Sequence, residues 1–122
     1  MELKDKIGIT DGFPKEGISF KDVSPLFADG RYLKYALDKM SEIAGNFHPS
    51  IVLGPEARGF LFGPAIAYRL GIGFVMARKK GKLPGDLVSV SYGLEYGCDE
   101  LFIEKGFWIL LRFFKDCDRM YL

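Results

Sequence analysis

A short polar loop between an apolar run and a helix-like segment constrains this chain more than any other feature. Residues 51–53 (Ile-Val-Leu) form a continuous apolar run typical of a buried strand. The loop GPEARGF follows at residues 54–60, and the next segment continues to Leu70 before Gly71, a residue type that commonly ends helices. A second apolar run occupies residues 74–77. This order predicts a parallel, right-handed β-α-β unit and therefore an α/β fold.

The loop at residues 54–60 has the composition of an anion site. A helix N-terminus presents unpaired N–H groups and the positive end of the helix dipole, and Arg58 adds a planar cation suited to phosphate. Gly54 and Gly59 allow the backbone to approach a bound group, while Glu56 can orient Arg58 or accept from a sugar hydroxyl. An arginine at a helix start is also commonly solvated or salt-bridged, so this loop alone leaves both interpretations open.

A basic loop follows the second predicted strand. Residues 78–85 read RKKGKLPG and combine cations, glycines and a proline in one connector. Such a loop can fold over a polyanionic substrate, supply charge and exclude water. A solvated basic turn is the ordinary alternative for a charged run. Two phosphate-suited loops after consecutive strands favour a polyanion site.

The remaining segments predict further elements on both sides of this unit. Strand alternation at residues 87–92 resumes at Leu101 and Ile103 after a predicted turn at residues 97–99, which indicates an antiparallel hairpin. Near the start, a short charged helix or turn precedes residues 13–26, where prolines and glycine predict an extended binding loop.

A packing helix is predicted after that loop. Asp29 is its expected N-cap, apolar residues then recur at helical spacing, and Gly45 is its expected end.

Four segments, in this order and spacing, resemble adenine phosphoribosyltransferase. They are FPKEGISFKDVSPL at residues 13–26, GPEARGFLFG at 54–63, RKKGKLPG at 78–85 and SYGLEYG at 91–97. Four motifs in register make a specific match that runs from about Phe13 to Lys105. The resemblance implies a partial type I phosphoribosyltransferase fold, with a parallel β-α-β core and an antiparallel hairpin.

The resemblance also implies a reaction of purine salvage, in which adenine and phosphoribosyl pyrophosphate give AMP and pyrophosphate with substrate-bound Mg²⁺. It implies a homodimer, and a pyrophosphate loop whose first peptide is commonly cis. The implied roles are adenine binding by Phe20 and Lys21, pyrophosphate binding by Glu56, Ala57, Arg58, Lys79, Lys82 and Tyr96, and catalysis by Arg78 in a mobile loop and by Glu95.

Two of these residues have ordinary alternatives. Phe20 is an aromatic residue in a predicted loop, and such residues commonly belong to the core. Glu95 is equally well explained as an exposed strand residue.

The chain departs from the family pattern after Lys105. The family continues into a buried strand with two adjacent acidic residues and a Thr- and Gly-rich loop for the ribose 5'-phosphate. Residues 107–122 instead read FWILLRFFKDCDRMYL, an atypical tail without that loop. We interpret residues 1–122 as a single, incomplete phosphoribosyltransferase domain, truncated or divergent at its C-terminus. The alternative is an inactive fragment that binds pyrophosphate or pairs with a full-length subunit.

Bulk composition excludes some partners. Seventeen Lys and Arg against sixteen Asp and Glu leave a net charge of +1, which favours neither nucleic acid nor an anionic membrane. Cys98, Cys117 and the single His48 have no metal-ligand spacing, so no protein metal site is expected. Few cysteines and a charged start (MELKDK) favour the cytoplasm, and the longest apolar run is too short to span a bilayer.

Overall fold

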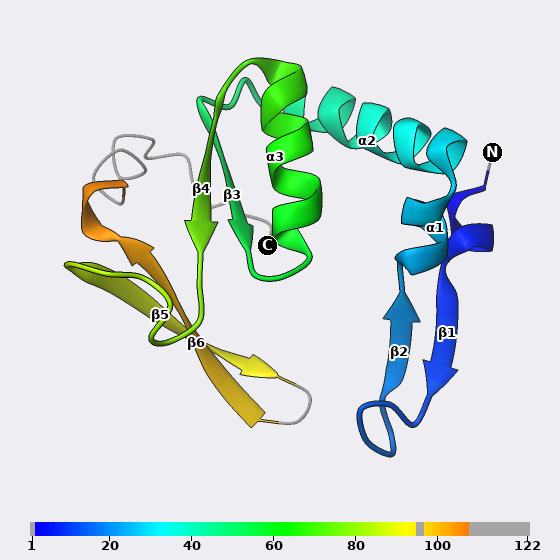
Figure 1. Ribbon diagram of the computed structural model, residues 1–122, viewed down its shortest axis with the longest axis horizontal. Coiled ribbons are helices and arrows are strands. Elements are labelled where there is room, and N and C mark those ends of the chain that lie inside the picture. The colour runs from blue at the N-terminus through cyan, green and yellow to red at the C-terminus, as the bar shows by residue number, and fades with distance from the viewer. Residues whose placement is uncertain (1, 95–96, 108–122) are drawn as a thin grey trace. The chain divides into compact units, whose positions relative to one another are not determined.

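The computed structural model describes residues 2–94 and 97–107, and Figure 1 shows its elements. The chain divides into two compact units, Met1–Phe47 and His48–Leu122, and each is described by itself. Of the atypical tail predicted at residues 107–122, residues 108–122 lie outside the described residues.

A β-hairpin opens the first unit. After the 3-10 helix η1 (Leu3–Lys6), β1 (Gly8–Asp11) pairs antiparallel with β2 (Ser19–Asp22). The N–H of Gly12 donates to the carbonyl of Ile18 at 2.7 Å and closes the connection between the two strands. The short charged helix or turn expected near the start is confirmed as η1.

The prediction of an extended loop at residues 13–26 is wrong, because the second half of this segment forms β2 and the start of the short helix α1 (Ser24–Ala28). Pro25 lies in the first turn of α1, where its missing N–H breaks no helical hydrogen bond. Proline therefore begins a helix here and does not interrupt regular structure. Leu26 of α1 is buried in the core of this unit.

The predicted packing helix is α2 (Gly30–Gly45), and its N-cap is confirmed. Oδ1 of Asp29 accepts from the N–H groups of Arg31 at 3.1 Å and Tyr32 at 3.5 Å. Oδ2 of Asp29 also lies 3.2 Å from Nζ of Lys6. One carboxylate thus caps α2 and ties it to η1, and the pKa of Asp29 is lowered mainly by its hydrogen bond with Lys6.

The second unit contains the predicted β-α-β unit. β3 (Ile51–Pro55) and β4 (Gly73–Ala77) are parallel, and α3 (Gly59–Leu70) connects them, as Figure 1 shows. Gly71 ends α3 with a left-handed φ of 70°, the conformation that favours glycine at a helix C-terminus. Buried apolar residues from α3 and β4 form the core of this unit: Ile66, Ala67, Val75 and Ala77.

Gly54 and Gly59 have a structural role in this unit. A Cβ placed on Gly54 would lie 2.6 Å from the carbonyl oxygen of Gly59 and 2.8 Å from Cε2 of Phe74. The ring of Phe74 meets that of Phe60 edge-on, with centroids 6.1 Å apart. The two glycines therefore allow the end of β3, the loop and the start of α3 to pack closely on one another. The sequence had suggested that they make room for a bound group.

An antiparallel hairpin of β5 (Leu87–Leu94) and β6 (Gly97–Glu104) follows, as predicted. The turn predicted at residues 97–99 is wrong, because the strand register pairs Leu94 with Gly97 and places those three residues inside β6. Glycine and aspartate in this stretch were interpreted as turn signals, but cross-strand hydrogen bonding continues through them. Among the described residues, no helix has the length and apolar character needed to cross a bilayer.

Candidate active site

Both predicted anion loops begin at the same edge of the parallel strands. The register pairs Pro55, the last residue of β3, with Ala77, the last residue of β4. The N–H of Glu56 extends this ladder by donating to the carbonyl of Ala77 at 3.0 Å. Ligands in open α/β sheets bind beyond the carboxyl ends of the strands. The loops at residues 56–58 and 78–82 therefore start side by side where a ligand site is expected.

Glu56 connects the two loops. Its Oε1 accepts a 2.7 Å hydrogen bond from the N–H of Lys79 and lies 3.4 Å from Nε of Arg78. The hydrogen bond from Lys79 is the main cause of a lowered pKa for Glu56, and the charges of Arg78 and Lys82 add to it against partial desolvation. The side chain is only 17% exposed. Glu56 is therefore an ionised link between the loops, a role that differs from the predicted ones toward Arg58 or a sugar.

Arg78 is held by three elements. Its guanidinium carbon lies 5.6 Å from the ring centroid of Phe60, at the start of α3, in a cation–π contact. Its N–H donates to the carbonyl of Phe102 at 2.9 Å, and its carbonyl accepts from the N–H of Phe102 at 2.7 Å. Its Nε is buried and has no hydrogen bond, so the 3.4 Å approach to Glu56 is an ion pair. The strand β6, the start of α3 and the loop at residues 56–58 thus fix the position of Arg78.

Arg58 immediately precedes α3, as predicted, and its side chain is exposed. The peptide between Glu56 and Ala57 is cis, as the family resemblance implies. The carbonyls of Ala57 and Arg58 already accept from the N–H groups of Phe60 at 3.1 Å and Leu61 at 3.0 Å. The first turn of α3 therefore offers an anion fewer free N–H donors than the sequence suggested, and the guanidinium of Arg58 becomes the main candidate for anion binding in this loop.

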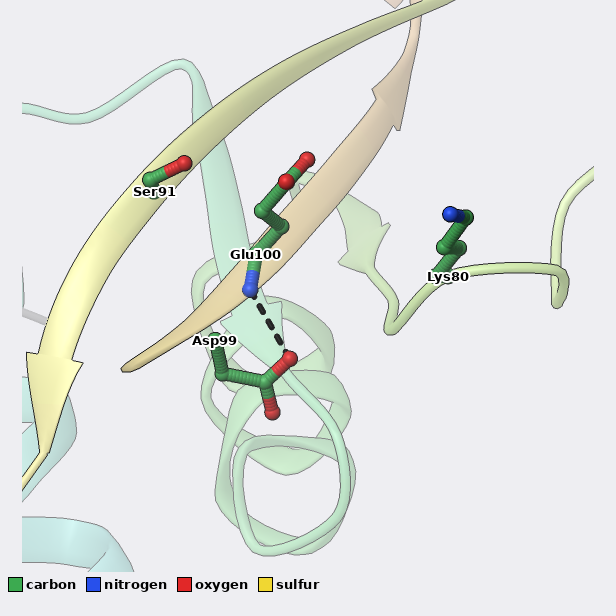
Figure 2. Close-up of a pocket in the computed structure, with 4 residues that line it drawn as sticks. All are labelled: Lys80, Ser91, Asp99 and Glu100. Carbon is green, nitrogen blue, oxygen red and sulfur yellow. Dashed lines mark hydrogen bonds between the residues drawn. The ribbon is translucent and has the colours of Figure 1, made fainter. Parts of the chain in front are cut away.

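The basic loop carries its lysines close to β6. Nζ of Lys79 lies 3.6 Å from Oδ2 of Asp99, and the N–H of Lys82 donates to the carbonyl of Lys79 at 3.3 Å. Positive φ values of 80° at Gly81 and 79° at Gly85 turn the backbone within this loop. A hollow of about 190 Å³ lies beside it (Figure 2), and the residues that line it are Lys80, Ser91, Asp99 and Glu100.

Asp99 is a site-proximal residue that the sequence reasoning missed. It was assigned to a turn, and only the correct register of the hairpin places it on β6 opposite the basic loop. The signal available in the sequence was an acidic residue in a strand that follows a run of lysines.

The predicted adenine-binding residues belong to the first unit. Phe20 and Lys21 are consecutive in β2, and Phe20 is half-buried. The ring of Phe20 meets that of Phe13 edge-on, with centroids 5.1 Å apart, and Nζ of Lys21 donates to Oγ of Ser19 at 3.0 Å. Packing against Phe13 is compatible with either interpretation of Phe20, as core residue or as base platform.

The structure brings Glu56, Arg78 and Lys79 together and places Lys82 in the same loop. Glu95 and Tyr96 lie outside the described residues. Within the described part of the chain, no three His, Cys, Asp or Glu side chains form a group able to hold a metal ion.

The chain is similar to known adenine phosphoribosyltransferases, although no family model matches it. It is 56% identical over 105 residues to the adenine phosphoribosyltransferase of Clostridium botulinum (strain Eklund 17B), which covers 86% of this chain and 61% of that protein. The solved adenine phosphoribosyltransferase of Thermoanaerobacter pseudethanolicus matches with a TM-score of 0.79 at 45% identity, covering 84% of this chain and 60% of that one.

The adenine phosphoribosyltransferase of Saccharomyces cerevisiae, solved with D-2,5-dideoxy-2,5-imino-altritol 1,6-bisphosphate and adenine, matches with a TM-score of 0.76 at 39% identity. That match covers 84% of this chain and 61% of the yeast chain. The chain thus spans about three fifths of the length of these relatives. Its resemblance to adenine phosphoribosyltransferases, and with it the α/β fold of the type I phosphoribosyltransferases, is confirmed over the part of those proteins that it spans.

Proposed function

We propose that this chain takes part in purine salvage as an adenine phosphoribosyltransferase, converting adenine and phosphoribosyl pyrophosphate to AMP and pyrophosphate. The observation that carries the proposal is the junction of Glu56 with Arg78 and Lys79, at the carboxyl ends of two parallel strands. Similarity to adenine phosphoribosyltransferases at 56% and 45% identity supports the same activity. The yeast relative holds adenine, which supports adenine as the base.

The diphosphate of the sugar substrate is the group that the two loops of the second unit would hold. Arg58 offers a planar, two-pronged donor, and Lys79 and Lys82 add compact positive charges. As the bond to the anomeric carbon breaks, negative charge grows on the departing pyrophosphate and positive charge on the sugar ring. Cations fixed before the reaction stabilise that departing group without reorganising.

Glu56 and Arg78 have complementary parts in this proposal. Because Glu56 binds the main chain of Lys79, it sets the spacing between the two loops that carry the cations. Arg78 balances the charge of Glu56 and keeps its guanidinium beside Phe60. Ala57 would contribute through its backbone, since its side chain is a methyl group.

The base would be held by the residues that the family resemblance implies. Phe20 would stack on adenine, and Lys21 would lie next to the base. Glu95 would donate or accept a proton at the purine N7, and Tyr96 would contact the pyrophosphate side of the reacting centre.

Mg²⁺ belongs to the substrate in this proposal and would arrive on the oxygens of phosphoribosyl pyrophosphate, where it neutralises phosphate charge. We further propose a cytoplasmic homodimer. Low cysteine content supports the compartment, and the family resemblance supports the dimer.

The proposal is tested by measuring AMP formation from adenine and phosphoribosyl pyrophosphate with the purified chain. Replacing Arg58 with Ala should lower kcat/KM on the order of a hundredfold, because one prearranged cation facing the leaving group is lost. Arg31→Ala is the matched control, since Arg31 is an exposed arginine on α2 and should leave the rate unchanged. Full activity of the Arg58 variant would contradict the assignment.

Two further measurements distinguish the alternative function from catalysis. Calorimetric uptake of pyrophosphate without any AMP formation, or a mixed species with intact enzyme in size-exclusion chromatography, would support an inactive, binding-only chain. Absence of turnover, of pyrophosphate uptake and of a mixed species would contradict both functions.

A further inference from the structure

Main-chain hydrogen bonds join the basic loop to β6 at its start and to the residue after β6 at its end. At its start, Arg78 and Phe102 exchange two main-chain hydrogen bonds of 2.9 and 2.7 Å. At its end, the N–H of Lys105, just after β6, donates to the carbonyl of Asp86 at 2.9 Å. Since β6 and the residue after it anchor the two ends, a charged side chain on this strand is well placed to act on the lysines between them.

Asp99 is such a side chain, and its two oxygens have separate partners. Oδ1 accepts a 2.8 Å hydrogen bond from the N–H of Glu100, which Figure 2 shows as a dashed line. Oδ2 lies 3.6 Å from Nζ of Lys79. The local hydrogen bond restricts the carboxylate, so that its second oxygen remains directed to the loop.

Lys79 is therefore bound in two directions. Its main-chain N–H donates a hydrogen bond to Glu56, in the first anion loop, while its ammonium group is paired with Asp99. The backbone of Lys79 is thus fixed next to the site, and only its side chain is engaged elsewhere. The ammonium group can therefore change its partner while the backbone stays in place.

The pair between Lys79 and Asp99 is weak enough to be exchanged. The side chain of Lys79 is 53% exposed and that of Asp99 is 31% exposed. Ion pairs with this solvent access contribute little, whereas a diphosphate carries several negative charges and strong acceptor oxygens. A diphosphate bound at the Arg58 loop should therefore displace the carboxylate of Asp99 as the partner of the Lys79 ammonium group.

We propose that Asp99 is a positioning residue that competes with the substrate diphosphate for the ammonium group of Lys79. This proposal rests on the proposed function, because it requires a diphosphate to bind beside Glu56 and Arg58. In the free chain, Asp99 holds Lys79 at β6. On binding, Lys79 transfers to the phosphate oxygens and Asp99 is left to solvent.

The test uses the full chain and inorganic pyrophosphate in titration calorimetry. Asp99→Asn keeps an oxygen for the N–H of Glu100 but removes the charge that holds Lys79, so pyrophosphate should bind about 1.5- to 5-fold more tightly. Glu100→Gln removes the same charge from the next residue of β6 and should change the affinity much less. An equal gain in both variants would overturn the proposal, because it would reflect net charge alone.

A double-mutant cycle isolates the competition. In chains that already carry Lys79→Met, the further change Asp99→Asn should leave pyrophosphate affinity unchanged. A persisting gain in that background would overturn the proposal. If the parent chain binds no pyrophosphate, the proposed function fails too; if it binds and Asp99→Asn has no effect, the competition alone is refuted.

Trypsin provides a measurement without ligand. Release of the ammonium group should expose the loop to cleavage, so Asp99→Asn should be cut after Lys79 faster than the parent chain and Glu100→Gln. Equal cleavage rates in all three chains would contradict a hold on Lys79 by Asp99.

Discussion

The main-chain N–H of Lys79 donates a 2.7 Å hydrogen bond to Oε1 of Glu56, a residue 23 positions earlier in the chain. This bond joins the loop after β3 to the loop after β4, and Arg78 reinforces it with an ion pair to the same oxygen. An acidic residue in an anion site is repulsive toward the anion. Its presence here is explained by its hold on the second loop.

Acid should remove the contribution of Glu56 to stability. The folded-state pKa of Glu56 is lowered, so its stabilising effect is fully present above about pH 5 and is lost as the pH falls through the lowered value. The free energies of unfolding of the parent chain and Glu56→Gln should therefore differ most at neutral pH and converge in acid. Urea unfolding at several pH values measures this difference. Glu16→Gln, at an exposed position, is the control, and an equal pH dependence in both variants would contradict the prediction.

Removing the charge of Arg78 should raise the pKa of Glu56 without restoring its ordinary value. The hydrogen bond from the main chain of Lys79 is the first cause of the lowered pKa, and it survives in Arg78→Gln. Lys82→Gln should raise the pKa less, because Lys82 contributes less than Arg78. Titration of the side-chain carboxyl carbon by NMR checks this order, and a larger effect of Lys82→Gln would refute it.

Gly54→Ala should destabilise the second unit by about 1–3 kcal/mol, the usual cost of an overpacked site. The new methyl group would meet the carbonyl oxygen of Gly59 and the ring of Phe74. Gly30→Ala is the matched control, because its Cβ would meet nothing within 4 Å and alanine favours a helix by up to about 1 kcal/mol. Thermal unfolding of both variants decides the point, and equal melting temperatures would argue against close packing at Gly54.

Asp29→Asn should separate the two roles of Asp29 in the first unit. Asparagine caps a helix as well as aspartate does, so α2 should form, but the charge opposite Lys6 is lost. Because the pKa of Asp29 is lowered, the parent chain gains stability above the ordinary aspartate pKa and loses it in acid, and the variant should lack this dependence. Asp29→Ala should lose the cap as well. Helical circular dichroism against pH measures both effects; identical curves for Asn and Ala would exclude a capping role.

The sequence was a good guide where hydrophobic pattern and helix-end signals agree. The parallel pair of β3 and β4, the helix between them and its end at Gly71 follow from short apolar runs and one left-handed glycine. The cap at Asp29 follows from side-chain chemistry within three residues. Such features depend on local interactions, which a single sequence contains.

Features that depend on pairing between distant segments were harder to predict. The hairpin turn was misplaced because glycine and aspartate at residues 97–99 are common in turns, and only the cross-strand register shows that they lie in β6. The contacts of Glu56 with Arg78 and Lys79 were not predicted for the same reason, since both residues are remote from it in sequence. β2 was missed because its partner β1 is short and largely exposed, with no apolar alternation to signal it.

The ladder between Arg78 and Phe102 consists of main-chain groups alone. Most side chains at either position can therefore be exchanged without detaching the loop from the hairpin. Proline is the exception, because each residue donates through its N–H and proline has none. Position 78 can therefore carry any natural residue except proline while the two main-chain hydrogen bonds that hold the loop to β6 are kept.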